Sequence, residues 1–527
     1  MRKIYLPVFI FLISWTIFSA NIGGLSIYSL DEAKNATCAR EMLERGDLIV
    51  PTFNYELRTD KPPMHYYFMM LAYKIFGVSE FSARFFSSFF GALTVLITFL
   101  FARRFFNEKV AFFSSLALFS SLHASLQFHM AVPDPYLIFY ISLTLFAFYA
   151  AFREKSDKFL YLSYLAMGLG VLTKGPVAVV LPGLIVLSFL FYKRSFNVET
   201  FKFLKIFRGI LIILAVSLPW YIAVTIKTHG VWLEEFIFKH NLHRFSDSME
   251  GHGGIFLMTF LFVFFGMLPF SVYVVQTFIK GWKDRRHNDF LVFLIFYVSI
   301  YTIFFAISKT KLPNYTTPVY PALAILLGYF IFKMEYINLK RYKVGFSIAL
   351  FIVVSLIAVA GLYFGIKSDP VLKQLDYLAF YFFIWTVGGL VALYFYLRHK
   401  KPIEINFSLS VFSIVLIFAF FYLMFPKIDK ENPVVVMLPL IDKSKPVVAY
   451  RGFNPAFAFY IRKRIPKFNS VDELESYLSK QNDKVYILTR KKYLKDLQNE
   501  KNLIILSERK DIFEKTTSIL LTNKVEK

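Results

Sequence analysis

The sequence predicts a polytopic α-helical membrane protein that ends in a small α/β domain. Of its 527 residues, 57% are hydrophobic and only 18% are charged, whereas about a quarter of a soluble domain is charged. Hydrophobic runs such as 208–226 and 345–366 are long enough to cross a hydrocarbon core of about 30 Å as helices. They lack the strict alternation of a membrane barrel, so helices are the expected spanning form. From residue 427 onward the pattern changes to short strand and helix signals.

The hydrophobic runs within residues 1–426 predict about 13 membrane-spanning helices, at roughly 20 residues each. The predicted spans are 4–20, 82–101, 110–127, 135–152, 159–172, 176–192, 209–226, 255–279, 290–307, 318–332, 344–366, 377–397 and 406–425. The first run follows two basic residues, as the core of a signal peptide does. It is long for such a peptide and has no clear small-residue cleavage motif, so we expect a retained helix.

Basic residues cluster in every second loop between these runs, and the positive-inside rule places such loops in the cytoplasm. The clusters are Arg2/Lys3, Arg103/Arg104/Lys109, Arg153/Lys155/Lys158, Lys193/Arg194/Lys202/Lys205/Arg208, Lys280/Lys283/Arg285/Arg286, Lys340/Arg341/Lys343 and Arg398/Lys400/Lys401. Orientation and lipid headgroups therefore explain the net charge of +24, and no nucleic-acid partner is expected. The remaining loops and the C-terminal tail fall on the outer face.

The first outer loop, residues 21–80, begins with a predicted amphipathic helix over 30–45 at the membrane interface. Ser29 and Glu32 have the spacing of a capping box, and Gly46 ends the pattern of apolar and small residues. Glu32 is thus expected to cap the helix. Asp31 is left in the first turn, where the helix dipole favours its ionised form.

The same loop contains a second predicted interfacial helix, which follows Pro62 and Pro63 and ends at Gly77. Asp60 and Lys61 lie in the rigid turn before it. Taken alone, they could be an exposed ion pair that contributes almost nothing to stability.

Further charged residues lie in the other predicted outer loops. Asp134 stands between two prolines at the start of a span, and Lys174 lies in a tight turn between two spans. The remaining outer residues of interest are Lys239, His240, His243, Arg244 and His252 in segment 239–254, and Lys309, Lys311 and Tyr315 in segment 308–321. The three histidines raise the possibility of a zinc site, but their spacing fits no zinc motif, and zinc is the weaker interpretation.

If these loops converge, one or two carboxylates lie beside several fixed cations at the membrane surface. Such a site suits a lipid-linked phosphate, because cations neutralise the phosphate and a carboxylate accepts a proton or orients the attacking oxygen. The chain contains neither a P-loop nor a Rossmann glycine motif, so a nucleotide donor bound in those ways is not expected.

The tail, residues 427–527, is predicted to form an α/β domain of roughly 90 residues outside the membrane. Segments 446–450, 484–489 and 502–506 have strand patterns. Segment 454–464 has a helix-start signal, and 470–478 carries Ser470 and Glu473 at capping-box spacing.

Together the outer-face motifs resemble those of the polyprenyl-phosphate-dependent membrane glycosyltransferases with the GT-C fold. The motifs are LDEAKNATCAREMLERGDLIVPTFNYELRTDKPPMHYYFMMLAYKIFG, AVPDP, TKGP, HNLHRF and KLPNYTTPVYPALAIL. The similarity is greatest to the bacterial aminoarabinose transferases that modify lipid A, relatives of the protein O-mannosyltransferases. It covers the membrane part, residues 1–426, and the tail resembles their periplasmic domain.

The resemblance implies a multi-pass enzyme of the bacterial inner membrane whose active site faces the periplasm. Its implied catalytic residues are Asp31 and Asp134, and its implied substrate-binding residues are Glu32, Asp60, Lys61, Lys174, Arg244, Lys311 and Tyr315. The implied donor is an undecaprenyl-phosphate-linked sugar, and the acceptor is lipid A or another glycan or protein. No cofactor or resident metal is implied. A divalent cation near the outer loops stays open, since Asp60 stands where the family often has Glu.

Two other classes of function stay open from the residues alone. Charged residues beside spans broken by Pro and Gly are also typical of a transporter or flippase. We see no inverted repeat, however, and the charges lie at one face rather than at the midplane. A membrane scaffold is the third possibility. The sequence does not identify the sugar, the acceptor or the oligomeric state.

Overall fold

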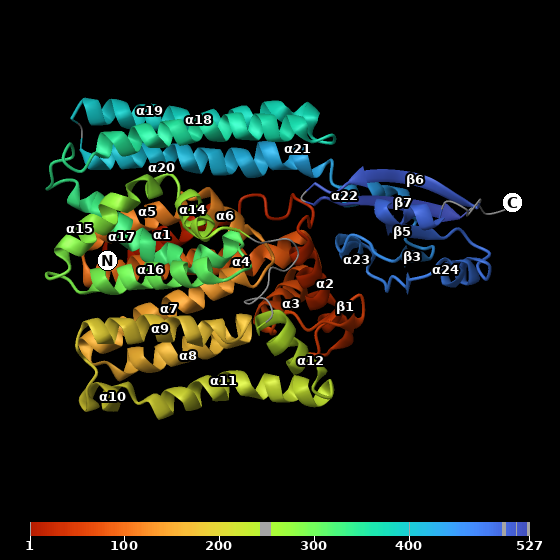
Figure 1. The fold of residues 1–527 in the computed structure, drawn as a ribbon, viewed down its shortest axis with the longest axis horizontal. Helices are drawn as coiled ribbons and strands as arrows, with labels where there is room; N and C mark the ends of the chain where they lie inside the picture. Colours follow the sequence, from red (N-terminus) through yellow and green to blue (C-terminus); the bar gives the residue numbers. More distant parts are fainter. Residues whose placement is uncertain (1, 243–253, 400, 498–501, 513, 524–527) are drawn as a thin grey trace.

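The protein consists of a long helical bundle with a small α/β domain at one end (Figure 1). The computed structural model describes residues 2–242, 254–399, 401–497, 502–512 and 514–523. In the bundle, α18, α19 and α20 form a layer on one side, and α8, α9 and α11 form a layer on the other (Figure 1).

The bundle contains the following helices. They are α1 (Arg2–Phe18), α4 (Glu80–Phe105), α5 (Glu108–Phe119), α6 (Leu122–His129), α7 (Asp134–Glu154), α8 (Asp157–Lys174), α9 (Val177–Tyr192), α10 (Val198–Leu204), α11 (Ile206–Lys227), α12 (Val231–Glu234), the π-helix η1 (Glu235–Leu242), α14 (Phe256–Gly266), η2 (Phe270–Tyr273), α15 (Val274–Asp284), α16 (Phe290–Ile307), η3 (Pro313–Val319), α17 (Tyr320–Lys333), α18 (Val344–Ser368), η4 (Lys373–Phe382), α19 (Phe383–Leu397), α20 (Pro402–Ala419), η5 (Phe420–Met424) and α21 (Phe425–Asp429).

Each predicted span coincides with a helix or a helix pair, but the predicted number of 13 spans is not confirmed. Within the described ranges, 8 helices are long and apolar enough to cross a membrane, or up to 10 if each bent pair is one span. The bent pairs are α5 with α6, at 68°, and α14 with the following η2 and α15, at 116°. Two further apolar helices, Tyr5–Phe18 and Val177–Tyr192, are shorter. Counting hydrophobic runs treats broken and short helices as full spans.

Ion pairs at one end of the bundle join the loops predicted to share the cytoplasmic side. Arg104 pairs with Glu154 at 2.5 Å, which connects the end of α4 to the end of α7. Lys193, after α9, pairs with Asp289, before α16, at 2.9 Å. Helices α10 and α15 also lie at this end, whereas α2, α3 and the tail domain lie at the opposite end (Figure 1). The arrangement matches the loop pairing expected from the basic clusters.

The first loop forms the two predicted helices, α2 (Leu30–Arg45) and α3 (Met64–Phe76), with the short strands β1 (Thr52–Phe53) and β2 (Glu56–Leu57) between them. Gly46 adopts φ 65° and donates its backbone N–H to the Leu43 carbonyl, which ends α2 as predicted.

The predicted cap at the start of α2 is wrong. The Ser29 side chain makes no capping hydrogen bond, and Glu32 is turned instead toward Arg84 on α4, at 2.7 Å. A buried, bidentate arginine provides a stronger partner for the carboxylate than the single backbone N–H that a capping box offers it.

Helix α2 is also more deeply buried than a helix lying on a membrane surface. Ala36 and Met42 pack in one cluster with Tyr73 of α3 and with Phe457 of the tail domain. The helix is therefore covered by the bundle and by the tail, rather than presenting one apolar face to lipid.

The tail folds as the predicted α/β unit, following α22 (Pro433–Met437) and η6 (Leu438–Leu440). Its elements are β3 (Val447–Tyr450), α23 (Ala456–Ile461), β4 (Lys467–Phe468), α24 (Val471–Leu478), β5 (Tyr486–Arg490), η7 (Lys491–Leu497), β6 (Leu503–Lys510) and β7 (Thr517–Asn523). The sheet order is β4-β3-β5-β7-β6, with β3 parallel to β4 and β5, and with β7 antiparallel to β5 and β6. The three predicted strands and the Ser470–Glu473 capping box are confirmed, whereas β4 and β7 were not predicted.

The two faces of this sheet have different partners. Val448 and Ile487 pack with Leu474 of α24 on one face, whereas Ala449 and Leu488 pack toward α23 and the first loop on the other. The alternation of side chains along each strand thus joins the tail to the bundle. Asn54 strengthens this junction, because its side chain accepts from the Ile465 N–H at 2.8 Å and donates to the Ile465 carbonyl at 2.9 Å.

Candidate active site

A cavity of about 300 Å³ opens at the end of the bundle that carries the tail domain. Its acidic and basic lining residues are Asp60, Lys61, Asp134, Lys174 and His240. Its other lining residues are Leu137, Pro176, Val177, Val180, Phe236, Ile237, Tyr301, Phe304, Phe305, Ser308, Asn314, Tyr315 and Pro318. The cavity therefore combines an extended apolar wall with a small set of charged groups.

Asp134 and Lys174 form an ion pair in the cavity wall, with 2.7 Å between Nζ and Oδ1. Asp134 begins α7 and Lys174 ends α8, so two helix ends bring together residues 40 positions apart. The Asp134 side chain is 4% exposed and that of Lys174 is 18% exposed. The Lys174 ammonium also lies 5.2 Å from the centre of the Tyr315 ring, within the range of a cation–π interaction.

A second group of charges surrounds Arg58, in the segment between β2 and α3. Its guanidinium lies 3.6 Å from the Asp31 carboxylate and 3.3 Å from that of Asp60. Asp60 also contacts His240 of η1 at 3.1 Å. Arg58 thus links Asp31, whose side chain is 48% exposed, to the wall of the cavity.

The segment that carries Arg58, Asp60 and Lys61 is held against η1 and α12. Thr59 donates a hydrogen bond to Glu235 at 2.6 Å, and the indole of Trp232 donates to the Arg58 carbonyl at 3.0 Å. The Trp232 ring in turn packs against the rings of Trp220 and Phe236, with ring centres 4.8 and 4.7 Å apart. These contacts fix the position of the charged turn before α3.

The electrostatics of this group keep both of its carboxylates ionised. The surrounding protein displaces water and so raises the pKa of Asp31, but the positive charges of Lys61 and Arg58 outweigh this effect and the pKa lies below its ordinary value. Desolvation likewise raises the pKa of Asp60, but the positive charges of Arg58 and His240 outweigh this effect. The pKa of Asp60 therefore also lies below its ordinary value. Asp31 is therefore a charged, weakly basic group at neutral pH.

Of the predicted site residues that the structure describes, Asp60, Lys61, Asp134, Lys174 and Tyr315 line one cavity, and Asp31 lies beside it. Arg244 and two of the three histidines considered for zinc, His243 and His252, lie outside the described residues. Among the residues described, there is no group of three or more His, Cys, Asp or Glu side chains that could hold a metal ion.

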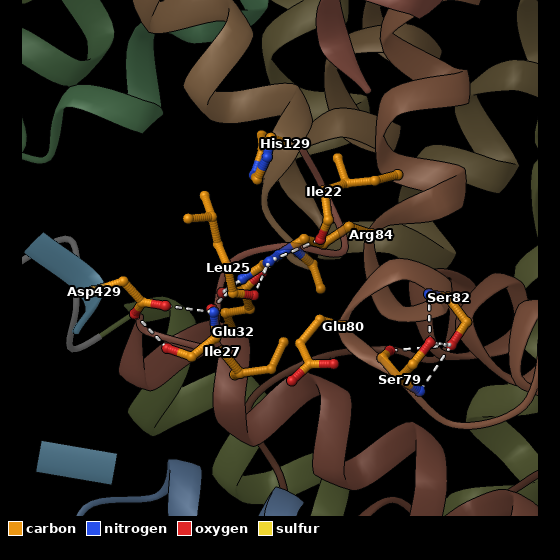
Figure 2. A network of polar contacts seen from close by, with 12 residues as sticks. Ile22, Leu25, Ile27, Glu32, Ser79, Glu80, Ser82, Arg84, His129 and Asp429 are labelled. Atoms are coloured by element: carbon orange, nitrogen blue, oxygen red, sulfur yellow. Dashed lines mark hydrogen bonds and ion pairs between the residues drawn. The ribbon is translucent and has the colours of Figure 1, made fainter. Parts of the chain in front are cut away.

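Two predicted substrate-binding residues are engaged elsewhere. Glu32 is fully buried in its pair with Arg84 (Figure 2). Lys311 is also buried and donates to the carbonyls of Ala306 and Ser308 at 3.0 and 2.6 Å, which satisfies the end of α16. Neither side chain lines the cavity, and their assignment to substrate binding stays a prediction.

The sequence interpretation missed Arg58 as a site residue, although it lies in a quoted motif. It also missed Thr59 and Glu235, which fix the turn. The roles of Thr59 and Glu235 depend on a contact between residues 176 positions apart, and the local sequence carries no signal for it. A search for arginines near Asp31 in the first loop would have found Arg58.

Comparison with known proteins now assigns the family. Residues 60–222 match the family profile described as dolichyl-phosphate-mannose-protein mannosyltransferase. An uncharacterized protein of Aquifex aeolicus is 32% identical over 390 residues, which cover 73% of this chain and 87% of that protein. The chain belongs to the polyprenyl-phosphate-dependent membrane glycosyltransferases with the GT-C fold. It is a multi-pass membrane protein of that family.

Other relatives agree with this family and fold. The undecaprenyl phosphate-alpha-4-amino-4-deoxy-L-arabinose arabinosyl transferase of Photorhabdus laumondii is 28% identical over 315 residues, 59% of this chain, and the match spans 56% of that transferase. The crystal structure of ArnT from Cupriavidus metallidurans bound to undecaprenyl phosphate superimposes with a TM-score of 0.81 at 20% identity, covering 100% of this chain and 98% of that one. The Archaeoglobus fulgidus oligosaccharyltransferase, in its apo form, gives 0.52 at 11% identity, covering 94% and 70%.

Proposed function

We propose that this protein transfers 4-amino-4-deoxy-L-arabinose from an undecaprenyl phosphate carrier to lipid A, at the periplasmic face of a bacterial inner membrane. The observation that carries the proposal is the pairing of Asp134 with Lys174, and of Asp31 with Arg58, beside one apolar-walled cavity. The relatives named as aminoarabinose transferases support the choice of sugar and carrier.

The cavity has the features that a polyprenyl phosphate donor requires. Leu137, Val180 and Phe304 offer apolar surface to a prenyl chain. Lys61 and Lys174 offer positive charge to a phosphate, which leaves as the carrier when the sugar is transferred. We assign Asp134 to holding Lys174 in place for this phosphate. Tyr315, beneath the lysine, is assigned to the same task, and Arg244 stays a predicted phosphate ligand.

The state of Asp31 favours an acceptor that is already ionised. A carboxylate whose pKa is held below its ordinary value removes a proton from a sugar or protein hydroxyl poorly. The phosphate oxygen of lipid A is charged at neutral pH and needs no strong base. We therefore assign Asp31 to orienting the acceptor, and its charge to stabilising the positive charge that develops on the sugar ring.

The test is mass spectrometry of lipid A from a bacterium that lacks its own aminoarabinose transferase and expresses this chain. We expect lipid A to gain the mass of aminoarabinose with the wild-type chain, and to gain far less with Asp31→Asn at equal protein level. Unmodified lipid A, in cells shown to contain the undecaprenyl-phosphate donor, would overturn the acceptor assignment. Transfer of a different sugar to lipid A would overturn the donor assignment.

Reconstitution distinguishes the enzyme from a transporter. In proteoliposomes with donor lipid and lipid A, a glycosyltransferase forms a covalent product and releases undecaprenyl phosphate. Movement of the donor lipid across the bilayer without a covalent product would favour the transporter interpretation.

A further inference from the structure

We propose that Arg84 and Glu32 form a buried positioning unit that fixes Asp31 relative to Asp134. The inference rests on the proposed function, since it assigns these two carboxylates to one reaction. Arg84 and Glu32 themselves do not line the cavity and are not proposed to touch substrate.

Arg84, on α4, uses all of its donor capacity on Glu32 and on the segment that leads into α2 (Figure 2). Its Nε and Nη2 donate to the two Glu32 carboxylate oxygens at 2.7 and 2.9 Å. Nη1 donates to the carbonyls of Ile22 and Leu25 at 2.9 and 2.7 Å, and Nη2 also donates to the Ser26 carbonyl at 2.6 Å. A guanidinium has five N–H donors, and all five are engaged here.

Glu32 connects the two segments that carry the proposed active-site carboxylates. The Glu32 oxygen that accepts from Arg84 Nε also accepts the backbone N–H of Ala131 at 2.9 Å. Asp31 directly precedes Glu32, and Asp134 follows Ala131 by three positions, through a proline. One carboxylate therefore holds the start of α2 and the approach to α7 at a fixed separation.

The turn-and-loop segment before α2 is held from its other side as well. The Ser26 N–H and hydroxyl donate to the Asp429 carboxylate at 2.8 and 2.5 Å, and the Ile27 N–H donates to the Tyr460 hydroxyl at 2.8 Å. The segment is therefore held on both sides, by Arg84 and by Asp429 with Tyr460.

The chemistry of the pair favours positioning over stability. Both side chains are 0% exposed, and a buried ion pair often adds little net stability compared with apolar packing, because both charges lose their hydration. A bidentate pair instead fixes the orientation of the guanidinium plane relative to the carboxylate plane. A lysine at position 84 would keep the charge but could not reach the carboxylate and three carbonyls in that fixed arrangement.

The test uses full-length protein, with transfer measured from undecaprenyl-phosphate-linked aminoarabinose to lipid A. Arg84→Lys is expected to lower kcat by about tenfold to a hundredfold, because a catalytic group displaced by about 1 Å can cost that much, with donor KM within about threefold. The matched control is Arg104→Lys, in the bidentate Arg104–Glu154 pair at the opposite end of the bundle. It should leave kcat within about twofold, as expected for a surface ion pair.

A double mutant separates positioning from general damage. If Arg84 acts through Asp31, then Arg84→Lys combined with Asp31→Asn should be no slower than Asp31→Asn alone, since interacting residues are not additive. Additive losses, or a kcat of Arg84→Lys within twofold of wild type, would overturn the proposal. If Arg84→Lys fails to fold, Glu32→Gln, which keeps the volume, is measured in the same way.

Hydrogen exchange gives a readout that does not depend on transfer. In Arg84→Lys or Glu32→Gln, peptides covering 20–29 and 130–134 should both lose protection by about tenfold or more, because the first segment is less firmly anchored through its carbonyls and the acceptor of the Ala131 N–H is disturbed. Unchanged exchange in either peptide would overturn the positioning unit even if transfer is normal. Absence of transfer by the wild-type chain would reject the proposed function, and the exchange result would still decide whether the unit links the two segments.

Discussion

Removal of the Lys174 charge is the perturbation whose cost follows most directly from the structure. Lys174→Met keeps the length and apolar stem of the side chain but leaves the Asp134 carboxylate, 4% exposed, without its partner at 2.7 Å. At an effective dielectric constant of about 20, charges at this distance attract by about 6 kcal/mol. Lys174 is 18% exposed toward the cavity, where water weakens that attraction.

We therefore expect Lys174→Met to lower the free energy of unfolding by about 3 kcal/mol, the lower part of the range for breaking a buried ion pair. The double variant Lys174→Met with Asp134→Asn removes the unpaired charge, so its free energy of unfolding should lie within about 1 kcal/mol of wild type. Unfolding in mixed detergent micelles, followed by tryptophan fluorescence, compares the variants. Transfer should be lost in both, because the phosphate loses a cation.

The result that would refute this reasoning is specific. A Lys174→Met variant as stable as wild type would mean that the Asp134 carboxylate is solvated or protonated without its partner. A double variant as unstable as the single one would mean that packing, and not the orphaned charge, caused the loss.

Three further outcomes are expected. Asp31→Asn should lower kcat by about tenfold to a hundredfold with lipid A as acceptor, and a loss under threefold would contradict its orienting role. Asp31 and Asp60 have a folded-state pKa below the ordinary value, so the stability from their ion pairs is fully present above about pH 4 and is lost only as pH falls through the lowered pKa. The melting temperatures of wild type and Asp31→Asn should therefore differ by a constant amount from pH 8 to 5. A difference that changes in this window would contradict the charge state. Asn54→Ala removes both hydrogen bonds to Ile465 and a residue suited to φ 55°. It should therefore destabilise the junction between tail and bundle by about 2–4 kcal/mol and speed proteolysis of the tail. Asn54→Asp keeps the hydrogen-bond acceptor and should destabilise the junction less.

The helices and strands could be predicted because their signals are local. Long apolar runs gave helices in the bundle, and the Ser470–Glu473 spacing correctly marked the start of α24. The same local logic failed at Ser29 and Glu32. A capping box is a short-range pattern, and a fully buried arginine 52 positions away took the carboxylate instead.

The candidate site shows the same division. Asp134 and Lys174 could be singled out by their positions at helix ends, but their mutual contact could not. Thr59 had no recognisable signal, because its partner Glu235 is 176 positions away, whereas Arg58 could have been found from its place in the same loop as Asp31. Lys311 looked like another site cation, and the structure uses it to satisfy carbonyls at the end of α16.

By itself, the sequence determined that this chain spans a membrane with helices, places the charged residues of its candidate site at one end of the bundle and folds its tail as an α/β unit. Hydrophobic length, charge asymmetry and strand alternation are properties of neighbouring residues, and they act wherever the segment lies. Only the tertiary structure decided which charges meet, how many helices are long enough to span, and that α2 lies covered between bundle and tail. Which side chains form ion pairs and which helices are buried depends on which distant segments come into contact, and packing across the whole chain sets those contacts.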